Sequence, residues 1–131
     1  MQLVDRWGDP NFAKMYADFR YDICAKAGND PEEISKIAVQ ALFESYDPEV
    51  IIPLHTLAQY FEGISILVQK NLIDVDTVEN LLSGRIIWYW DATELFIESV
   101  RERVGDPTMY HDLELLANEM KKRKAQQQGK S

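Results

Sequence analysis

The chain has 131 residues, 46% of them hydrophobic, and its 22 Asp and Glu outnumber 14 Lys and Arg to give a net charge of −8. This length predicts one domain whose core needs no metal or disulfide, and the composition excludes a disordered protein. The one cysteine, Cys24, excludes an internal disulfide and fits a reducing cytoplasm. We expect a soluble, cytoplasmic protein without a membrane span, because no apolar run reaches 18 residues and the N-terminus lacks a signal-peptide pattern.

Charge is distributed unevenly along the chain. Residues 1–120 hold nine basic and all 22 acidic residues, a charge of −13, whereas the other five basic residues lie in 121–131. A folded region with this much negative charge repels phosphate backbones, which argues against nucleic-acid binding by residues 1–120. We predict one helical domain over 1–120 and a basic, glutamine-rich, disordered tail over 121–131.

Proline marks the expected helix starts. Aspartate is a good N-cap, and proline at the first helical position loses no hydrogen bond, so each Asp-Pro pair predicts a helix beginning. The pairs are Asp9-Pro10, Asp30-Pro31, Asp47-Pro48 and Asp106-Pro107. The first helix is predicted over 10–27, with Gly28 as its C-cap, and the second over 31–46. After Pro48 we expect a short turn and an extended bridge, because Pro53 inside a helix would remove a hydrogen bond.

The stretch 53–70 is predicted to be the central helix. Five of its apolar residues recur at helical spacing on one face: Leu54, Leu57, Phe61, Ile64 and Val68. Further apolar residues lie off this face, so neighbours are expected on more than one side. The fold class that follows is all-α, a single-domain bundle of five helices around this one.

The fourth helix is predicted over 75–104, capped by Asp74 and ended by Gly105. Gly84 leaves two alternatives: one long helix with a tight crossing at the glycine, or two helices that meet there, for a total of six. We favour one helix, because neither a cap nor a proline accompanies the glycine. The last helix is predicted to start at Asp106-Pro107, and no segment shows the alternation of a β-strand.

Two sets of polar residues are candidates for chemistry. His55, Gln59 and Glu62 fall at i, i+4 and i+7 of the central helix, and Asp91, Glu94 and Glu98 at i, i+3 and i+7 of the fourth. Carboxylates beside a cleft can perform acid–base work or bind a cation, whereas the simpler interpretation of both sets is a solvated helix face. We expect neither a metal nor a cofactor, because the chain lacks His-Glu-x-x-His and Glu-x-x-His motifs, and no small-molecule ligand is identifiable.

Trp88, Tyr89 and Trp90 are consecutive, so on a helix they point about 100° apart and cannot all enter one core. A self-association surface is the functional interpretation, because aromatic residues are enriched at interface hot spots. Packing within one chain is the structural alternative.

Residues 57–117 resemble a family of small, uncharacterised prokaryotic helical domains. The resemblance is carried by Tyr60-Phe61-Glu62-Gly63, the Leu72-Ile73-Asp74 turn, Trp90 on a long helix, and the short helix after Asp106-Pro107. Many members carry an N-terminal membrane anchor, which we do not expect here. The resemblance implies a helical fold and no established activity.

Three hypotheses follow. The first is a non-enzymatic helical interaction or accessory module whose partner is a protein, most simply a second copy in a homodimer. The second is an acidic inhibitor or nucleic-acid mimic that binds a basic partner. The third is an enzyme that uses His55, Glu62 and the carboxylate row from Asp91 to Glu98, which requires these side chains to converge in one pocket.

Overall fold

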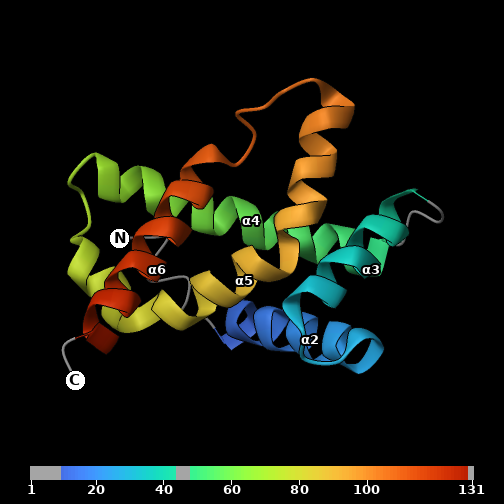
Figure 1. Cartoon of the computed structure of the whole chain (residues 1–131), viewed down its shortest axis with the longest axis horizontal. Coiled ribbons are helices and arrows are strands. Elements are labelled where there is room, and N and C mark those ends of the chain that lie inside the picture. The colour runs from blue at the N-terminus through green and yellow to red at the C-terminus, as the bar shows by residue number, and fades with distance from the viewer. Residues whose placement is uncertain (1–9, 44–47, 130–131) are drawn as a thin grey trace.

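The computed structural model describes residues 10–43 and 48–129, and these form five helices without a strand. The helices are α2 (Pro10–Ala27), α3 (Pro31–Phe43), α4 (Pro48–Gln69), α5 (Val75–Val104) and α6 (His111–Gly129), as Figure 1 shows. The all-α prediction with five helices is therefore confirmed. The second helix, predicted to run to residue 46, is helical to Phe43, and 44–47 lie outside the described residues.

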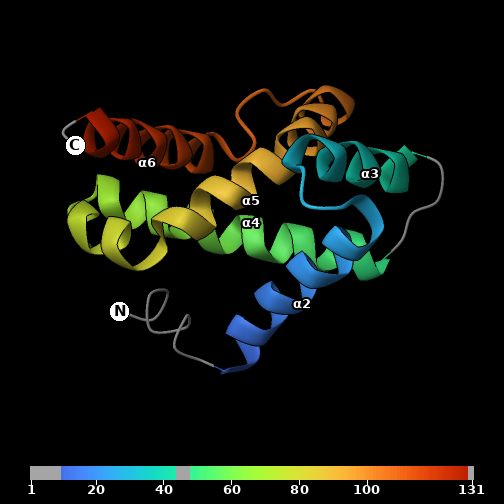
Figure 2. The same ribbon diagram turned by 60° about the horizontal axis from the view of Figure 1, so that its bottom comes forward.

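Helix α4 is the centre of the bundle, because it packs against each of the other four helices. Its predicted inner face is buried, with Leu54, Leu57, Phe61 and Ile64 all fully inaccessible to solvent. In Figure 2, α2 crosses on one side of α4 and α5 and α6 lie on the other. Within the described chain, one stretch, 51–69 in this helix, is long and apolar enough to cross a membrane. Its place in the bundle core accounts for the same composition.

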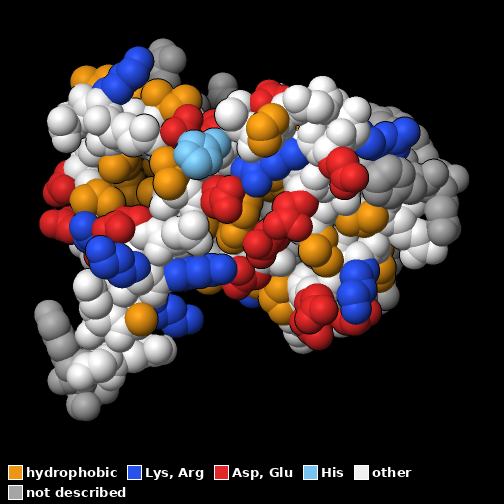
Figure 3. Space-filling model, turned by 45° about the horizontal axis from the view of Figure 1, so that its top comes forward, with side chains coloured by type: hydrophobic (Ala, Val, Ile, Leu, Met, Phe, Trp, Pro, Cys, Tyr) orange, Lys and Arg blue, Asp and Glu red, His pale blue; other side chains and the backbone are white. Residues whose placement is uncertain are grey.

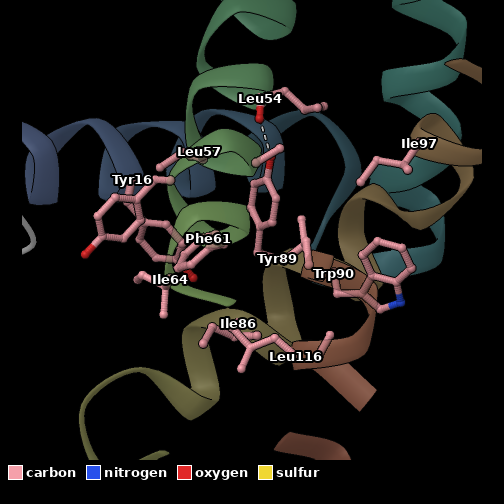
Figure 4. Packing of buried hydrophobic residues seen from close by; sticks show 14 of the residues in the cluster. Tyr16, Leu54, Leu57, Phe61, Ile64, Ile86, Tyr89, Trp90, Ile97 and Leu116 are labelled. Carbon is pink, nitrogen blue, oxygen red and sulfur yellow. Dashed lines mark hydrogen bonds between the residues drawn. The ribbon is translucent and has the colours of Figure 1, made fainter. Parts of the chain in front are cut away.

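The start of α4 differs from the prediction. The helix begins at Pro48 and continues through Pro53, where an extended bridge was expected. Ile51 and Leu54, on either side of the proline, are buried, and their burial offsets the one backbone hydrogen bond that the proline removes. Just beyond, the Tyr89 hydroxyl from α5 donates to the Leu54 carbonyl (Figure 4). A neighbouring side chain thus enters the hydrogen-bond ladder of α4.

Helix α5 is continuous through Gly84, as predicted, but the glycine is not at a tight crossing. A Cβ added at Gly84 would meet nothing within 4 Å. The helix bends further on, where its second half turns away from its first (Figure 1). There the Leu95 N–H donates to the buried Ser35 hydroxyl of α3 at 3.0 Å, and the Thr93 hydroxyl bonds the Tyr89 carbonyl at 2.7 Å. A side chain that takes an amide from the ladder is a recognised cause of a bend.

The last helix begins four residues later than predicted. Gly105 ends α5 in the left-handed conformation at φ 70°, as expected. Asp106 then accepts the Thr108 N–H at 2.9 Å, so the Asp-Pro pair opens a turn and not a helix. Tyr110 has a left-handed φ of 56°, and α6 starts at His111. A left-handed residue cannot lie inside an α-helix, which is why the turn separates the two helices.

The predicted disordered tail is also wrong for residues 121–129. They form the end of α6, and two of their basic side chains, Lys121 and Arg123, pair with acids on α5 and α6. Lys121 Nζ lies 2.5 Å from Asp91 Oδ1, and Arg123 contacts Asp76, Glu79 and Glu119 at 2.6, 2.8 and 3.0 Å. These ion pairs attach the basic segment to the acidic body.

Candidate functional site

The polar edge of α4 faces the turn that precedes α6. His55 Nδ1 lies 2.9 Å from the Tyr110 hydroxyl, and the imidazole ring meets the Phe96 ring edge-on at a centroid distance of 5.5 Å. Burial among these rings lowers the pKa of His55 below its ordinary value, so the imidazole is neutral at pH 7. Gln59, the exposed second member of the set, also hydrogen-bonds Tyr110.

Glu62, further along the same edge, caps the start of α6. Its Oε1 accepts the Leu113 N–H at 2.8 Å, one of the amides in the first turn that lack a partner within the helix. Burial raises the pKa of Glu62, and the bond from Leu113 opposes the shift. Ser65 donates to the Asp112 carbonyl at 2.6 Å, and Gln69 donates to the Asp112 carboxylate at 2.8 Å. This edge of α4 therefore anchors the start of α6.

The carboxylate row of α5 is not brought to this edge. Asp91 pairs with Lys121, whereas burial and the charge of Glu98 raise the pKa of Glu94. Phe96, which touches His55, points about 160–200° around the helix from Glu94 and Glu98. Figure 3 shows acidic side chains gathered in a band across one face, with Lys and Arg among them. His55 on α4 therefore contacts one side of α5, whereas Glu94 and Glu98 point to another. In the described part of the chain, no three His, Cys, Asp or Glu side chains are placed to hold a metal ion.

The three consecutive aromatic residues of α5 point in three directions, as expected, but two of them are covered within the chain. Tyr89 is fully buried against Phe61, and Trp90, which is 2% exposed, points away from it (Figure 4). Trp88 is partly buried at ring distances of 6.1 Å from Tyr16 and 6.5 Å from Phe19. The expected interface of Trp88, Tyr89 and Trp90 is therefore wrong for Tyr89 and Trp90, because no partner can reach them in the folded chain.

The same aromatic contacts leave an open groove between α2 and α5. Within the described chain the two helices do not approach closely by their backbones, and the long rings of Trp88, Tyr16 and Phe19 bridge them. The groove encloses about 640 Å³, and its lining includes Ala13, Ala17, Arg20, Tyr21, Cys24 and Arg85. The Tyr21 side chain, at 76% exposure, is the most exposed large hydrophobic residue described.

Sequence reasoning missed this groove, although a signal was present. Ala13, Ala17, Arg20 and Cys24 recur at i, i+4, i+7 and i+11 on a face of α2 that lies beside its core face. Three of the four side chains are small, so this face leaves room beside α5. The position of Arg85 in the groove follows only from the packing of α5 against α2.

The fold defines a class: an all-α bundle in which the candidate polar residues hold the helices together. A family model described as a domain of unknown function (DUF4760) matches residues 1–120, and the chain belongs to this family. No curated protein and no solved structure matches the chain. The resemblance noted from the sequence is thus confirmed for an uncharacterised domain family and extends over more of the chain than residues 57–117.

Proposed function

We propose that this protein is a non-enzymatic interaction module, and that a partner protein docks in the groove between α2 and α5. The observation that carries the proposal is the groove itself, an open and largely apolar surface beside Tyr21, whose side chain is 76% exposed. Exposed apolar surface with an aromatic residue at its margin is typical of protein-binding sites. A second copy of the chain is one partner that fits this proposal, with α2 rather than Tyr89 and Trp90 at the interface.

The polar residues support an interaction role over catalysis. His55 and Glu62 hold the start of α6, and Asp91 is paired with Lys121. The enzyme hypothesis required these side chains to converge, and they face different sides of α5. An acidic nucleic-acid mimic needs an uninterrupted row of unpaired charges, whereas Lys121 neutralises Asp91, the first member of this row.

The test places a photo-crosslinking amino acid at Ala17, inside the groove, in the full chain expressed in its native cells. The matched control places it at Leu115, an exposed apolar residue of α6. We expect a covalent protein adduct from position 17 and none from position 115. Mass spectrometry of the adduct and light scattering of the purified chain then establish whether the partner is a second copy. Equal adducts from both positions, or none from position 17, would refute the proposal.

A further inference from the structure

His55 accepts a hydrogen bond whose direction is set by its neighbours. Its Nδ1 lies 2.9 Å from the Tyr110 hydroxyl. Gln59 also hydrogen-bonds this hydroxyl, and its bond favours the ionised form of Tyr110, as a bond donated by an amide N–H does. The hydroxyl oxygen therefore accepts from Gln59, and the hydroxyl proton is donated to Nδ1. An imidazole that accepts at Nδ1 is neutral and carries its proton at Nε2.

The surroundings of His55 do not balance a positive charge. Burial lowers the pKa of His55, and no charged group of the described chain contributes to this shift. Helix α5 contributes an aromatic ring at this point. Glu62, on the same edge of α4, acts on Tyr110, and His111 and Asp112 at the start of α6 act on Glu62. Among the described residues, a proton added to His55 is therefore not compensated by a carboxylate.

The turn between α5 and α6 depends on side-chain contacts for its shape. Tyr110, its last residue, has a left-handed φ of 56°, which a residue other than glycine rarely adopts without support from its surroundings. Arg101 of α5 donates to the Met109 carbonyl at 2.8 Å and is paired with Glu114. Met109 and Tyr110 are partly buried against the core. The hydrogen bond between Tyr110 and His55 attaches the end of this turn to α4.

We propose that His55 and Tyr110 form an acid-sensitive latch, in which protonation of the imidazole at Nδ1 releases the turn between α5 and α6 from α4. Once protonated, Nδ1 is a donor and no longer accepts the Tyr110 hydroxyl proton. If the hydroxyl turned to accept from Nδ1, its own proton would lose its acceptor. Opening of the turn gives the imidazolium access to water and uncovers the apolar surfaces of Met109 and Tyr110. This latch is separate from the groove between α2 and α5.

The direction of the pH dependence follows from the burial of His55. The closed turn keeps the imidazole neutral, so the proton binds more readily once the turn is open and the imidazole is solvated. The latch therefore holds well above pH 6.5, the ordinary pKa of histidine, and weakens as the pH falls below that value. Glu62 acts in the opposite sense, because its raised pKa makes acid favour the folded form at that residue. A variant of His55 separates the two effects.

The experiment follows hydrogen exchange and ring signals in the full chain between pH 7.5 and 5. Protection is measured at the amides of His111 and Glu114, whose acceptors are the carbonyls of Thr108 and Tyr110. We expect the protection factors of these two amides to fall about threefold or more on acidification, and those of the α2 amides to stay constant. In ¹H–¹³C spectra, the ring signals of Tyr110 should move with the titration of the His55 imidazole.

A matched pair of substitutions assigns the effect to one histidine. His55→Gln keeps an acceptor for the Tyr110 hydroxyl but does not titrate, so the same protection factors should change by less than about 1.5-fold over this range. His111→Gln makes the same substitution at the other histidine of the chain, an exposed residue beside the turn, and should keep the wild-type response.

Protection that is constant with pH in wild type, or that falls equally in wild type and His55→Gln, would overturn the inference. A response that is lost in His111→Gln and kept in His55→Gln would do the same. If His55→Gln does not fold, the Tyr110 ring signals of wild type are decisive. Signals that move together with the His55 titration support the latch, and signals that stay fixed while His55 titrates reject it.

Discussion

Removing one buried hydroxyl, in Tyr89→Phe, tests the account of how α4 and α5 are joined. The Tyr89 hydroxyl donates to the Leu54 carbonyl and also hydrogen-bonds the backbone of Ala58, one turn further along α4. It therefore contacts, from α5, the carbonyl and the amide of one i, i+4 pair of α4. Phenylalanine keeps the ring contacts with Phe61 and Phe19 but leaves both backbone groups without this bridge.

The expected cost follows from burial. Tyr89 and Leu54 are fully inaccessible to solvent, so water cannot replace the lost hydroxyl. Losing a buried intramolecular hydrogen bond costs about 0.5–1.5 kcal/mol, and we expect a loss of about 1 kcal/mol in the free energy of unfolding. For a chain of this length the corresponding fall in Tm is about 3–5 °C.

Chemical and thermal unfolding followed by circular dichroism measures this difference. Tyr21→Phe is the control, because its hydroxyl is on a side chain that is 76% exposed, and it should change stability by less than about 0.5 kcal/mol. A Tyr89→Phe variant as stable as the control would refute the bridging role. Burial raises the pKa of Tyr89 well above its ordinary value of 10.0, so the unfolded chain releases this proton first. The wild-type advantage should be complete below pH 10 and should decline as the pH rises above it.

Three further predictions use the same measurements. Ser35→Ala removes the buried acceptor of the Leu95 N–H and should lower the free energy of unfolding by about 1–2 kcal/mol. Ser99→Ala removes a solvent-exposed bond to the carbonyl of Leu95 and should cost less than about half as much. Equal losses of stability would contradict the role of Ser35 in the bend. Burial raises the pKa of Glu62, so the folded chain binds this proton more tightly than the unfolded chain does. Unfolding at pH 7, 5.5 and 4 should therefore show wild type gaining stability relative to Glu62→Gln as the pH falls. A stability difference that stays constant with pH would argue against the raised pKa. Arg123→Ala should speed hydrogen exchange of the amides in 121–129 and leave the exchange of the α2 amides unchanged. Unaltered exchange in 121–129 would show that the ion pairs of Arg123 do not hold this end of α6.

Predictions from the sequence succeeded where a helix is defined by its own residues. The bounds 10–27 and the Gly28 cap followed from a proline, an apolar face and a glycine, and the structure confirms them. The continuous fourth helix with its Asp74 cap was predicted on the same grounds. These features depend on contacts between residues three or four positions apart, which periodicity records directly.

Predictions failed where a distant residue decided the local conformation. Pro53 is tolerated inside α4 because the neighbouring Ile51 and Leu54 are buried by other helices. The Asp106-Pro107 pair became a turn, whereas Asp30, also followed by proline, caps a helix as predicted. The residues that follow differ: Glu32 and Glu33 stand in the first turn of α3, whereas Thr108 donates to Asp106 through its backbone N–H and its hydroxyl.

The candidate site also combines features set by helical spacing with features set by tertiary packing. Sequence alone determined that His55, Gln59 and Glu62 share one face, because helical spacing requires it. Only the tertiary structure placed the start of α6 on that face and turned the carboxylates of α5 elsewhere. The groove between α2 and α5 likewise depends on packing, because it exists only where the Trp88 ring separates two helices that lie far apart in the sequence. Periodicity fixes which residues share a helix face, and the packing of helices decides what each face meets.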